Sequence, residues 1–178
     1  MKDYNTIRTR ANRLDTPDKA TGEAIYVDDI SKPGMLFGAI LQSPHAHAEI
    51  LSIDTTEAKK LPGVKAVITS KETGAIPYGV SPARYDETVL ATDKVRYVGD
   101  EIAAVAATSL DIALKAVELI KVAYEILPAV FTIEDAIKED APQLHEKYKG
   151  NLNAKVHQEF GDVEKGLKES DIDRKSVV

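Results

Sequence analysis

Residues 95–126 constrain the fold more than any other part of the sequence. Residues 95–97 and 102–107 are strand-like and separated by a Gly99-Asp100 turn signal, and residues 110–120 then repeat apolar side chains at helical spacing. Residues 122–126 alternate apolar and polar side chains, which predicts a half-exposed strand. Because the joints in this strand–helix–strand unit are short, we expect a right-handed parallel crossover and a mixed sheet in an α/β (α+β) fold.

Three further strands are predicted upstream of this unit. MLFGAILQ, residues 35–42, is apolar at consecutive positions, which is typical of a strand buried on both faces. Residues 48–54 follow Pro44, so the two segments form either a bent hairpin or one kinked strand. A short helix with a capping-box spacing at 54–57 leads to a third strand at 64–70.

The remaining segments are predicted to be irregular or short. Residues 1–20 are polar and are expected to form an extended arm. Residues 71–91 contain two glycines and two prolines and predict a long irregular loop, of the kind that is usually functional or packed on something else. Thr132 and Asp162 are each expected to open a short helix, and His145 and His157 are expected to be solvated.

The sequence offers few groups that could carry chemistry. His45 and His47 have a spacing that can chelate a metal on a strand, but no third ligand is fixed beside them, so a structural role is favoured. The adjacent acids are interpreted as turn or surface residues, because neighbours on a strand point to opposite faces; they occur at 28–29, 86–87, 100–101 and 139–140. The glycines never reach a phosphate-binding spacing. We therefore assign no catalytic, cofactor-binding or metal-binding residue.

Charge and composition exclude several classes of protein. The net charge is −6 and there is no basic stripe, which argues against nucleic acid and anionic membranes as partners. There are no cysteines, so any iron–sulfur cluster would have to sit in another chain. No apolar run approaches the roughly 20 residues that cross a bilayer, and a cytoplasmic location is expected.

Six segments in order resemble the N-terminal part of molybdenum hydroxylase large subunits, the superfamily of xanthine dehydrogenase, aldehyde oxidase and 4-hydroxybenzoyl-CoA reductase. They cover most of residues 13–171 and read DKATGEAIYVDDI, PGMLFGAILQSPHAHAEILSID, LPGVKAVITS, LATDKVRYVGDEIAAVAAT, ALKAVELIKVAYEILPAV and FGDVEKGLKESD. The resemblance implies an α/β hammerhead domain over residues 21–171. Residues 172–178 would then begin a following, truncated segment.

The same resemblance implies an enzyme that hydroxylates an aldehyde or N-heterocycle, or reduces 4-hydroxybenzoyl-CoA, with molybdopterin, [2Fe-2S] clusters and in some relatives FAD. Its cofactor loops and catalytic glutamate would lie in a continuation, so this part alone is expected to be inert. The expected partners are the remaining molybdenum-binding domains, an iron–sulfur subunit and an FAD subunit. The interface residues expected to face them are Tyr78, Tyr85, Tyr97, Gly99 and Asp100. A free-standing, non-catalytic binding or assembly module is the alternative.

Overall fold

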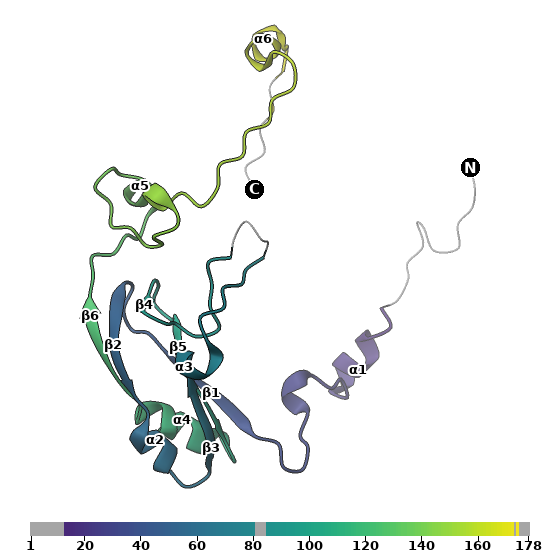
Figure 1. Ribbon diagram of the computed structural model, residues 1–178. Helices are drawn as coiled ribbons and strands as arrows, with labels where there is room; N and C mark the ends of the chain where they lie inside the picture. Colours follow the sequence, from purple (N-terminus) through teal and green to yellow (C-terminus); the bar gives the residue numbers. More distant parts are fainter. Residues whose placement is uncertain (1–12, 81–84, 173, 175–178) are drawn as a thin grey trace.

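Two small antiparallel sheets make up the body of the computed structural model, which describes residues 13–80, 85–172 and 174 (Figure 1). The first, sheet A, has the order β1-β5-β3, with β1 at Phe37–Gln42, β5 at Glu101–Ala107 and β3 at Val64–Thr69. The second, sheet B, has the order β4-β2-β6, with β4 at Lys94–Val95, β2 at Ala48–Asp54 and β6 at Lys121–Ile126. The α/β (α+β) class predicted from the sequence is confirmed, and β1 and β2 form neither a hairpin nor one strand.

The central unit keeps its predicted order but not its predicted pairing. Helix α4, Leu110–Glu118, follows β5 and begins at Ser109, whose side chain accepts a hydrogen bond from the backbone N–H of Ile112. The parallel crossover and the mixed sheet are wrong, because β6 leaves sheet A and pairs with β2 in sheet B, and all pairings between these strands are antiparallel. The two strands of the unit therefore belong to different sheets, with α4 as the link.

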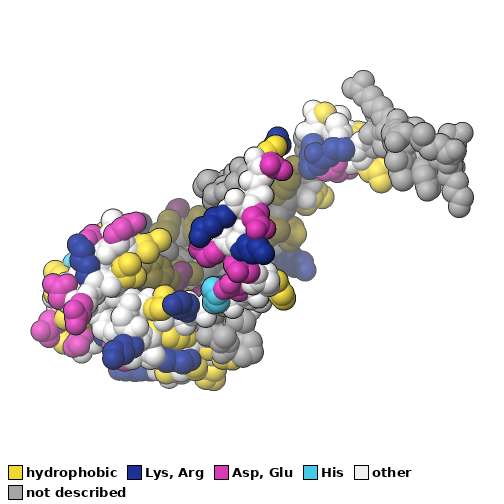
Figure 2. Space-filling view, turned by 90° about the horizontal axis from the view of Figure 1, so that it is seen from above, with side chains coloured by type: hydrophobic (Ala, Val, Ile, Leu, Met, Phe, Trp, Pro, Cys, Tyr) yellow, Lys and Arg dark blue, Asp and Glu magenta, His cyan; other side chains and the backbone are white. Residues whose placement is uncertain are grey.

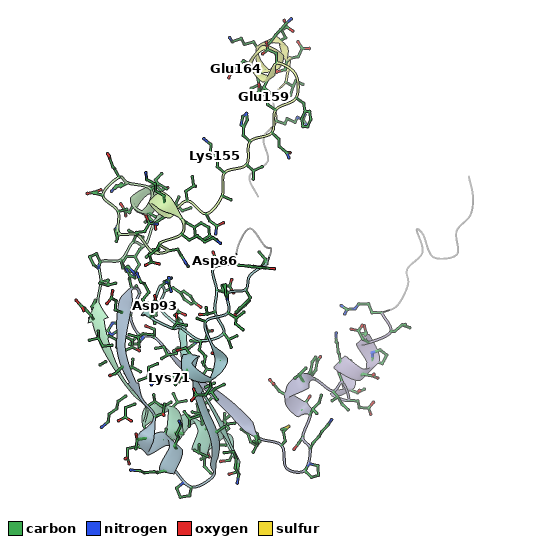
Figure 3. The ribbon with its side chains drawn as sticks, in the orientation of Figure 1. Lys71, Asp86, Asp93, Lys155, Glu159 and Glu164 are labelled. Carbon is green, nitrogen blue, oxygen red and sulfur yellow. The ribbon has the colours of Figure 1, made fainter. Side chains whose placement is uncertain are left out.

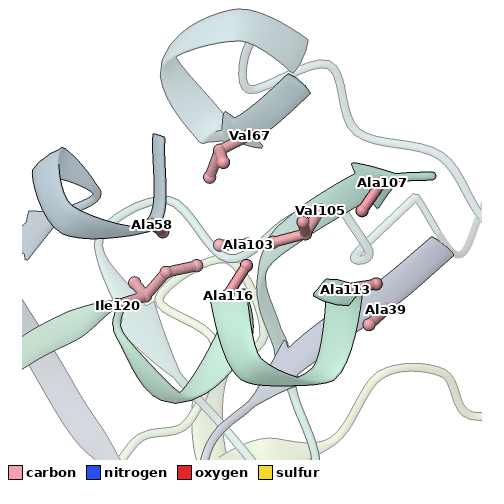
Figure 4. Packing of buried hydrophobic residues seen from close by; sticks show 9 residues of the cluster. All are labelled: Ala39, Ala58, Val67, Ala103, Val105, Ala107, Ala113, Ala116 and Ile120. Carbon is pink, nitrogen blue, oxygen red and sulfur yellow. The ribbon is translucent and has the colours of Figure 1, made fainter. Parts of the chain in front are cut away.

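The main core lies between sheet A and α4 (Figure 4). Helix α4 turns Ala113 and Ala116 toward β1 and β5, and these small side chains let the helix approach the sheet closely. Ile120 closes the cluster at the end of the helix. A second cluster packs Ile102 of β5 against Ala48, Ala91 and Val95, and so joins the two sheets.

Short helices occupy the connections between strands and the segments at the two ends of the chain. We call residues 152–172 the C-terminal arm. Helices α2 (Thr56–Lys60) and α3 (Ser70–Thr73) flank β3, and α5 (Ile133–Ala136) and the 3-10 turn η3 (Lys149–Asn151) follow β6. Thr132 caps α5 as predicted, and Asp162 caps α6 (Val163–Glu169). No helix in the described ranges has the length and apolar character needed to cross a membrane.

The structure differs in part from three predictions. The described part of the predicted N-terminal arm, residues 13–20, contains most of helix α1, Thr16–Thr21, and the 3-10 turn η1, Val27–Asp29, follows it; residues 1–12 lie outside the described residues. Strand β1 is not buried on both faces, since Ala39 is its one buried residue. The predicted loop at 71–91 is partly ordered, because α3 begins it and Tyr78 forms an isolated β-bridge with Glu87.

Candidate functional site

A pocket of about 260 Å³ opens where three segments meet at one end of the body. The segment between α3 and β4 supplies one wall, the turn between β4 and β5 a second, and the region after α5 the third. In Figure 3, Asp86 and Asp93 lie at this end, whereas Lys155, Glu159 and Glu164 lie far out on the C-terminal arm. The lining residues are Tyr78, Asp86, Glu87, Thr88, Ala91, Arg96, Tyr97, Asp100, Glu101 and His145.

The turn between β4 and β5 is held against the end of β1. Gly99 has a φ of 98°, a conformation that favours glycine, and its N–H donates to the carbonyl of Ser43 at 2.9 Å. The N–H of Ser43 donates in return to the carbonyl of Asp100 at 2.8 Å. These two bonds fix the turn, so Tyr97 and Asp100 face the pocket from a rigid support.

The carboxylates of this turn are partly withdrawn from water. Asp100 accepts the N–H of Arg96 at 2.9 Å, yet burial outweighs this bond and raises the pKa of the Asp100 carboxyl. The hydroxyl of Tyr97 donates to Glu101 at 3.1 Å. Burial first, and then the neighbouring charges of Asp100 and Glu101, raise the pKa of Tyr97 to about 12. Tyr97 is therefore a neutral hydrogen-bond donor at physiological pH.

Two cations connect this turn to the C-terminal region. Arg96 donates through Nε to the carbonyl of Leu144 at 3.0 Å, and Lys94 Nζ lies 2.5 Å from Glu146 Oε1. The hydrogen bond from Lys94 lowers the pKa of Glu146 to about 2. His145 lines the pocket and is half-buried, so the prediction that it is solvated is wrong; burial, followed by the charge of Arg96, lowers its pKa.

The structure brings the predicted interface residues together. Tyr78, Tyr97 and Asp100 line the first pocket, and Tyr85 lines an adjoining hollow of about 250 Å³ that shares several of its walls. Gly99, with its positive φ, forms the turn that carries Tyr97 and Asp100. The three tyrosines remain exposed to solvent over a large part of their surface.

The acidic character of the pocket does not follow from the sequence. The sequence predicts turn or surface positions for the pairs at 86–87 and 100–101, but all four acidic residues line the same pocket. The acids at 28–29 and 139–140 lie exposed on the surface, as expected. No pattern in the sequence places residue 86 beside residue 100, because the contact depends on how the long segment before β4 folds back.

His45 and His47 do not form a metal site. They lie between β1 and β2 rather than on a strand, and the ring of His45 stands edge-on to Tyr124 with centroids 4.8 Å apart. His47 is buried, and its Nδ1 lies 2.6 Å from the carbonyl oxygen of Pro128. In the part of the chain that the structure describes, no three His, Asp or Glu side chains are grouped so that they could hold a metal ion.

The pocket does not fit a phosphate-bearing cofactor such as molybdopterin. Four carboxylates face it, against the guanidinium of Arg96 and a histidine whose lowered pKa favours its neutral form. Phosphate groups would be repelled by this excess of negative charge. The arrangement instead presents tyrosine hydroxyls and carboxylates at one end of the body.

Comparison with known proteins gives a consistent set of matches. The family described as "Aldehyde oxidase and xanthine dehydrogenase, a/b hammerhead domain" matches residues 21–128. The chain is 45% identical over 160 residues to a probable xanthine dehydrogenase subunit of Bacillus subtilis, covering 89% of this chain and 21% of that protein. It is 37% identical over 175 residues to the nicotinate dehydrogenase large molybdopterin subunit of Eubacterium barkeri, covering 96% of this chain and 40% of that one.

Solved structures give the same result. Quinoline 2-oxidoreductase from Pseudomonas putida 86 superposes with a TM-score of 0.74 at 35% identity, over 82% of this chain and 19% of that chain. The Cu,Mo-CO dehydrogenase structure superposes with a TM-score of 0.70 at 40% identity, over 78% of this chain and 18% of that chain. The chain thus spans a minor part of the length of these relatives.

Proposed function

The chain belongs to the aldehyde oxidase and xanthine dehydrogenase family, and residues 21–128 are the a/b hammerhead domain of that family. From this we propose that the chain is a structural domain of the large subunit of a molybdopterin-dependent oxidoreductase. The whole enzyme would hydroxylate an aldehyde or, as favoured by relatives named for xanthine, nicotinate and quinoline, an N-heterocycle. The molybdenum chemistry would take place in the remainder of the large subunit. This chain would supply a scaffold that the remainder packs against.

One observation carries the scaffold role. The elements α1, η1 and α6 bury no residue of their own, while Val27 and Phe160 are 82% and 89% exposed. Isolated helices of six or seven residues are not stable in water, because nucleation is costly and few hydrogen bonds repay it. Both arms therefore need a further protein surface, which the remainder of a large subunit would provide.

The pocket face is the second proposed contact. Tyr78, Tyr85, Tyr97, Gly99 and Asp100 would meet the iron–sulfur subunit or a neighbouring domain, and an FAD subunit would join the assembly in relatives that use one. Three half-exposed tyrosines, of which Tyr97 lies on the rigid turn, support this proposal, since tyrosine gives a large contact area at low entropic cost and is enriched at interfaces.

A split reconstitution tests the scaffold role. We define the remainder polypeptide as the Bacillus subtilis relative from which the 160 matched residues have been deleted. Mixed with the full 178-residue chain, it is expected to form a one-to-one complex, measured by light scattering after size-exclusion chromatography. An unrelated domain of similar size is the control. A chain that stays monomeric beside a soluble remainder polypeptide would favour the free-standing assembly module.

The tyrosine contact is tested in a complete large subunit that carries this chain. The double variant Tyr78→Ala/Tyr85→Ala is expected to weaken association with the iron–sulfur subunit by about tenfold or more, as for interface tyrosines in general. Leu114→Ala, which truncates an exposed apolar side chain on α4, is the control. Unchanged assembly of the double variant would remove the pocket face from the interface.

A further inference from the structure

The outer face of sheet A, on the side away from α4, is an uncovered apolar surface. Directly opposed residues on neighbouring strands point to the same face, so the register defines its rows. Ile40 of β1 and Ile68 of β3 both pair with Ala104 of β5. Gly38 and Ala66 both pair with Ala106 in the next row. None of these six residues has a polar side chain.

This face continues the core of the chain. One row further along β5, Ile102 points to the same side and is fully buried by Ala48, Ala91 and Val95. Beyond that cover the face is open: Ile40 is 53% exposed, and Ala104 and Ala106 are half-buried. The chain's own residues therefore cover one end of the face and leave the other uncovered.

The sequence of β1 has the character of a strand with cover on both sides. The run MLFGAILQ predicted burial on two faces, and the structure provides cover on one, where α4 packs. An edge strand that faces water is normally protected by charge or proline, and β1 has neither. The second cover that the sequence predicts would have to come from outside the described residues.

The shape of the face indicates what covers it. Ala104 on the central strand lies between Ile40 and Ile68, and in the next row Ala106 lies between Gly38 and Ala66. Four of the six side chains are therefore alanine or glycine, which lets the apolar stripe of a helix approach the sheet closely, as Ala113 and Ala116 of α4 do on the opposite face. In Figure 2 the visible side of the molecule instead mixes acidic, basic and hydrophobic side chains, which marks an ordinary solvated surface.

We propose that the outer face of sheet A, defined by Gly38, Ile40, Ala66, Ile68, Ala104 and Ala106, docks the apolar stripe of a helix from the remainder of the large subunit. The inference rests on the proposed function, and the length of the relatives supports this occupant: the matched segment is 21% of the Bacillus subtilis protein, so most of that polypeptide is available to supply the helix. The result would be a sheet with a helix on each face.

Cysteine labelling tests this docking directly, since the chain has no cysteine of its own. Ile40→Cys and, on the exposed side of α4, the control Lys115→Cys are each reacted with a maleimide dye in the full chain, alone and with the remainder polypeptide. We expect the complex to slow labelling at position 40 by about tenfold or more, and to leave position 115 unchanged.

A charged substitution gives a second readout. Ile40→Lys is expected to weaken the complex by about tenfold or more, because a lysine would be desolvated in an apolar contact. The matched control Leu114→Lys, at a position 51% exposed on α4, is expected to leave affinity unchanged. Circular dichroism of the free variants checks that both remain folded.

These experiments distinguish a failure of the proposed function from a failure of the docking proposal. Absence of any complex overturns the proposed function and the docking with it. A complex in which position 40 labels as fast as in the free chain overturns the docking alone. Protection of position 40 in the free chain that grows with its concentration shows that a second copy covers the face, and overturns the proposed occupant.

Discussion

His47 and Pro128 are joined by a hydrogen bond between residues 81 positions apart in the sequence, with Nδ1 of His47 lying 2.6 Å from the Pro128 carbonyl oxygen. A carbonyl can only accept, so Nδ1 carries the proton. The backbone carbonyl of His47 accepts in turn from the N–H of Leu127 at 2.9 Å. Together these bonds fasten the segment after β6 to the end of the loop before β2, and so extend the pairing of these two strands of sheet B.

Removing this imidazole is expected to destabilise the domain. His47→Phe leaves the Pro128 carbonyl without its donor in a buried site, which typically costs about 1–3 kcal/mol. The control His157→Phe changes an exposed histidine that lies 3.2 Å from Glu159 and is expected to stay within about 0.5 kcal/mol of the parent. Urea unfolding measures both. Equal stabilities for the two variants would show that the bond is not structural.

Gly63 and Gly99 separate steric crowding from backbone strain. Both have positive φ values, 97° and 98°, but a Cβ at Gly63 would lie 2.7 Å from Cδ1 of Ile112, whereas a Cβ at Gly99 would meet no heavy atom within 4 Å. We expect Gly99→Ala to lose about 1 kcal/mol from strain alone and Gly63→Ala to lose about 2–3 kcal/mol. Thermal unfolding measures the difference. A larger loss at Gly99 would contradict the packing of α4 against the turn before β3.

The ion pair between Lys94 and Glu146 predicts a pH dependence. The lowered pKa of Glu146, about 2, means that its contribution to stability is present above its ordinary pKa and is lost as the pH falls toward about 2. Because Glu146 is largely exposed, Glu146→Gln should cost only about 0.5–1 kcal/mol at pH 7. The exposed Glu139→Gln is the control. Urea unfolding across the pH range should show the deficit shrinking with acid; a constant deficit would contradict the ion-pair origin.

For Asp100 we expect the opposite pH dependence of stability, a contribution that is lost as the pH rises. Burial raises its pKa, so the folded state favours the protonated carboxyl, and this contribution is present below the ordinary pKa of 3.8 and lost as the pH rises through the raised value. Asp100→Asn keeps an acceptor for the N–H of Arg96 without the buried charge. We expect this variant to be more stable than the parent at pH 7, by up to about 1 kcal/mol, and equally stable in acid. Lower stability at pH 7 would show that the charge itself is needed.

Local structure was largely predictable, because its causes are local. The ranges of β1, β2, β3, β6 and α4 follow from apolar periodicity and from cap residues such as Ser109 and Thr132. The pairing of β6 was not predictable, since consecutive strands joined by a helix favour a parallel crossover, whereas here β1 and β3 compete successfully for the two edges of β5 and β6 pairs with β2. That competition depends on contacts far apart in the sequence.

The candidate site was likewise predictable only where its features are local in the sequence. The tyrosines and the Gly99-Asp100 turn could be identified from loop length and turn chemistry, but not the neighbours that give the pocket its charge. Asp86 and Glu87 arrive from the segment before β4, and His145 from the region after α5. Each looks like an ordinary solvated residue in the sequence, and the pocket becomes acidic only when the three segments meet.

If this chain is the hammerhead scaffold of a molybdopterin-dependent large subunit, it should replace the corresponding part of a relative. We would measure the molybdenum content of a chimera in which this chain replaces the 160 matched residues of the Bacillus subtilis relative. We expect molybdenum per large subunit, and turnover in a xanthine dehydrogenase assay, comparable to those of the parent. A chimera that is soluble and monodisperse but contains no molybdenum would contradict the scaffold role.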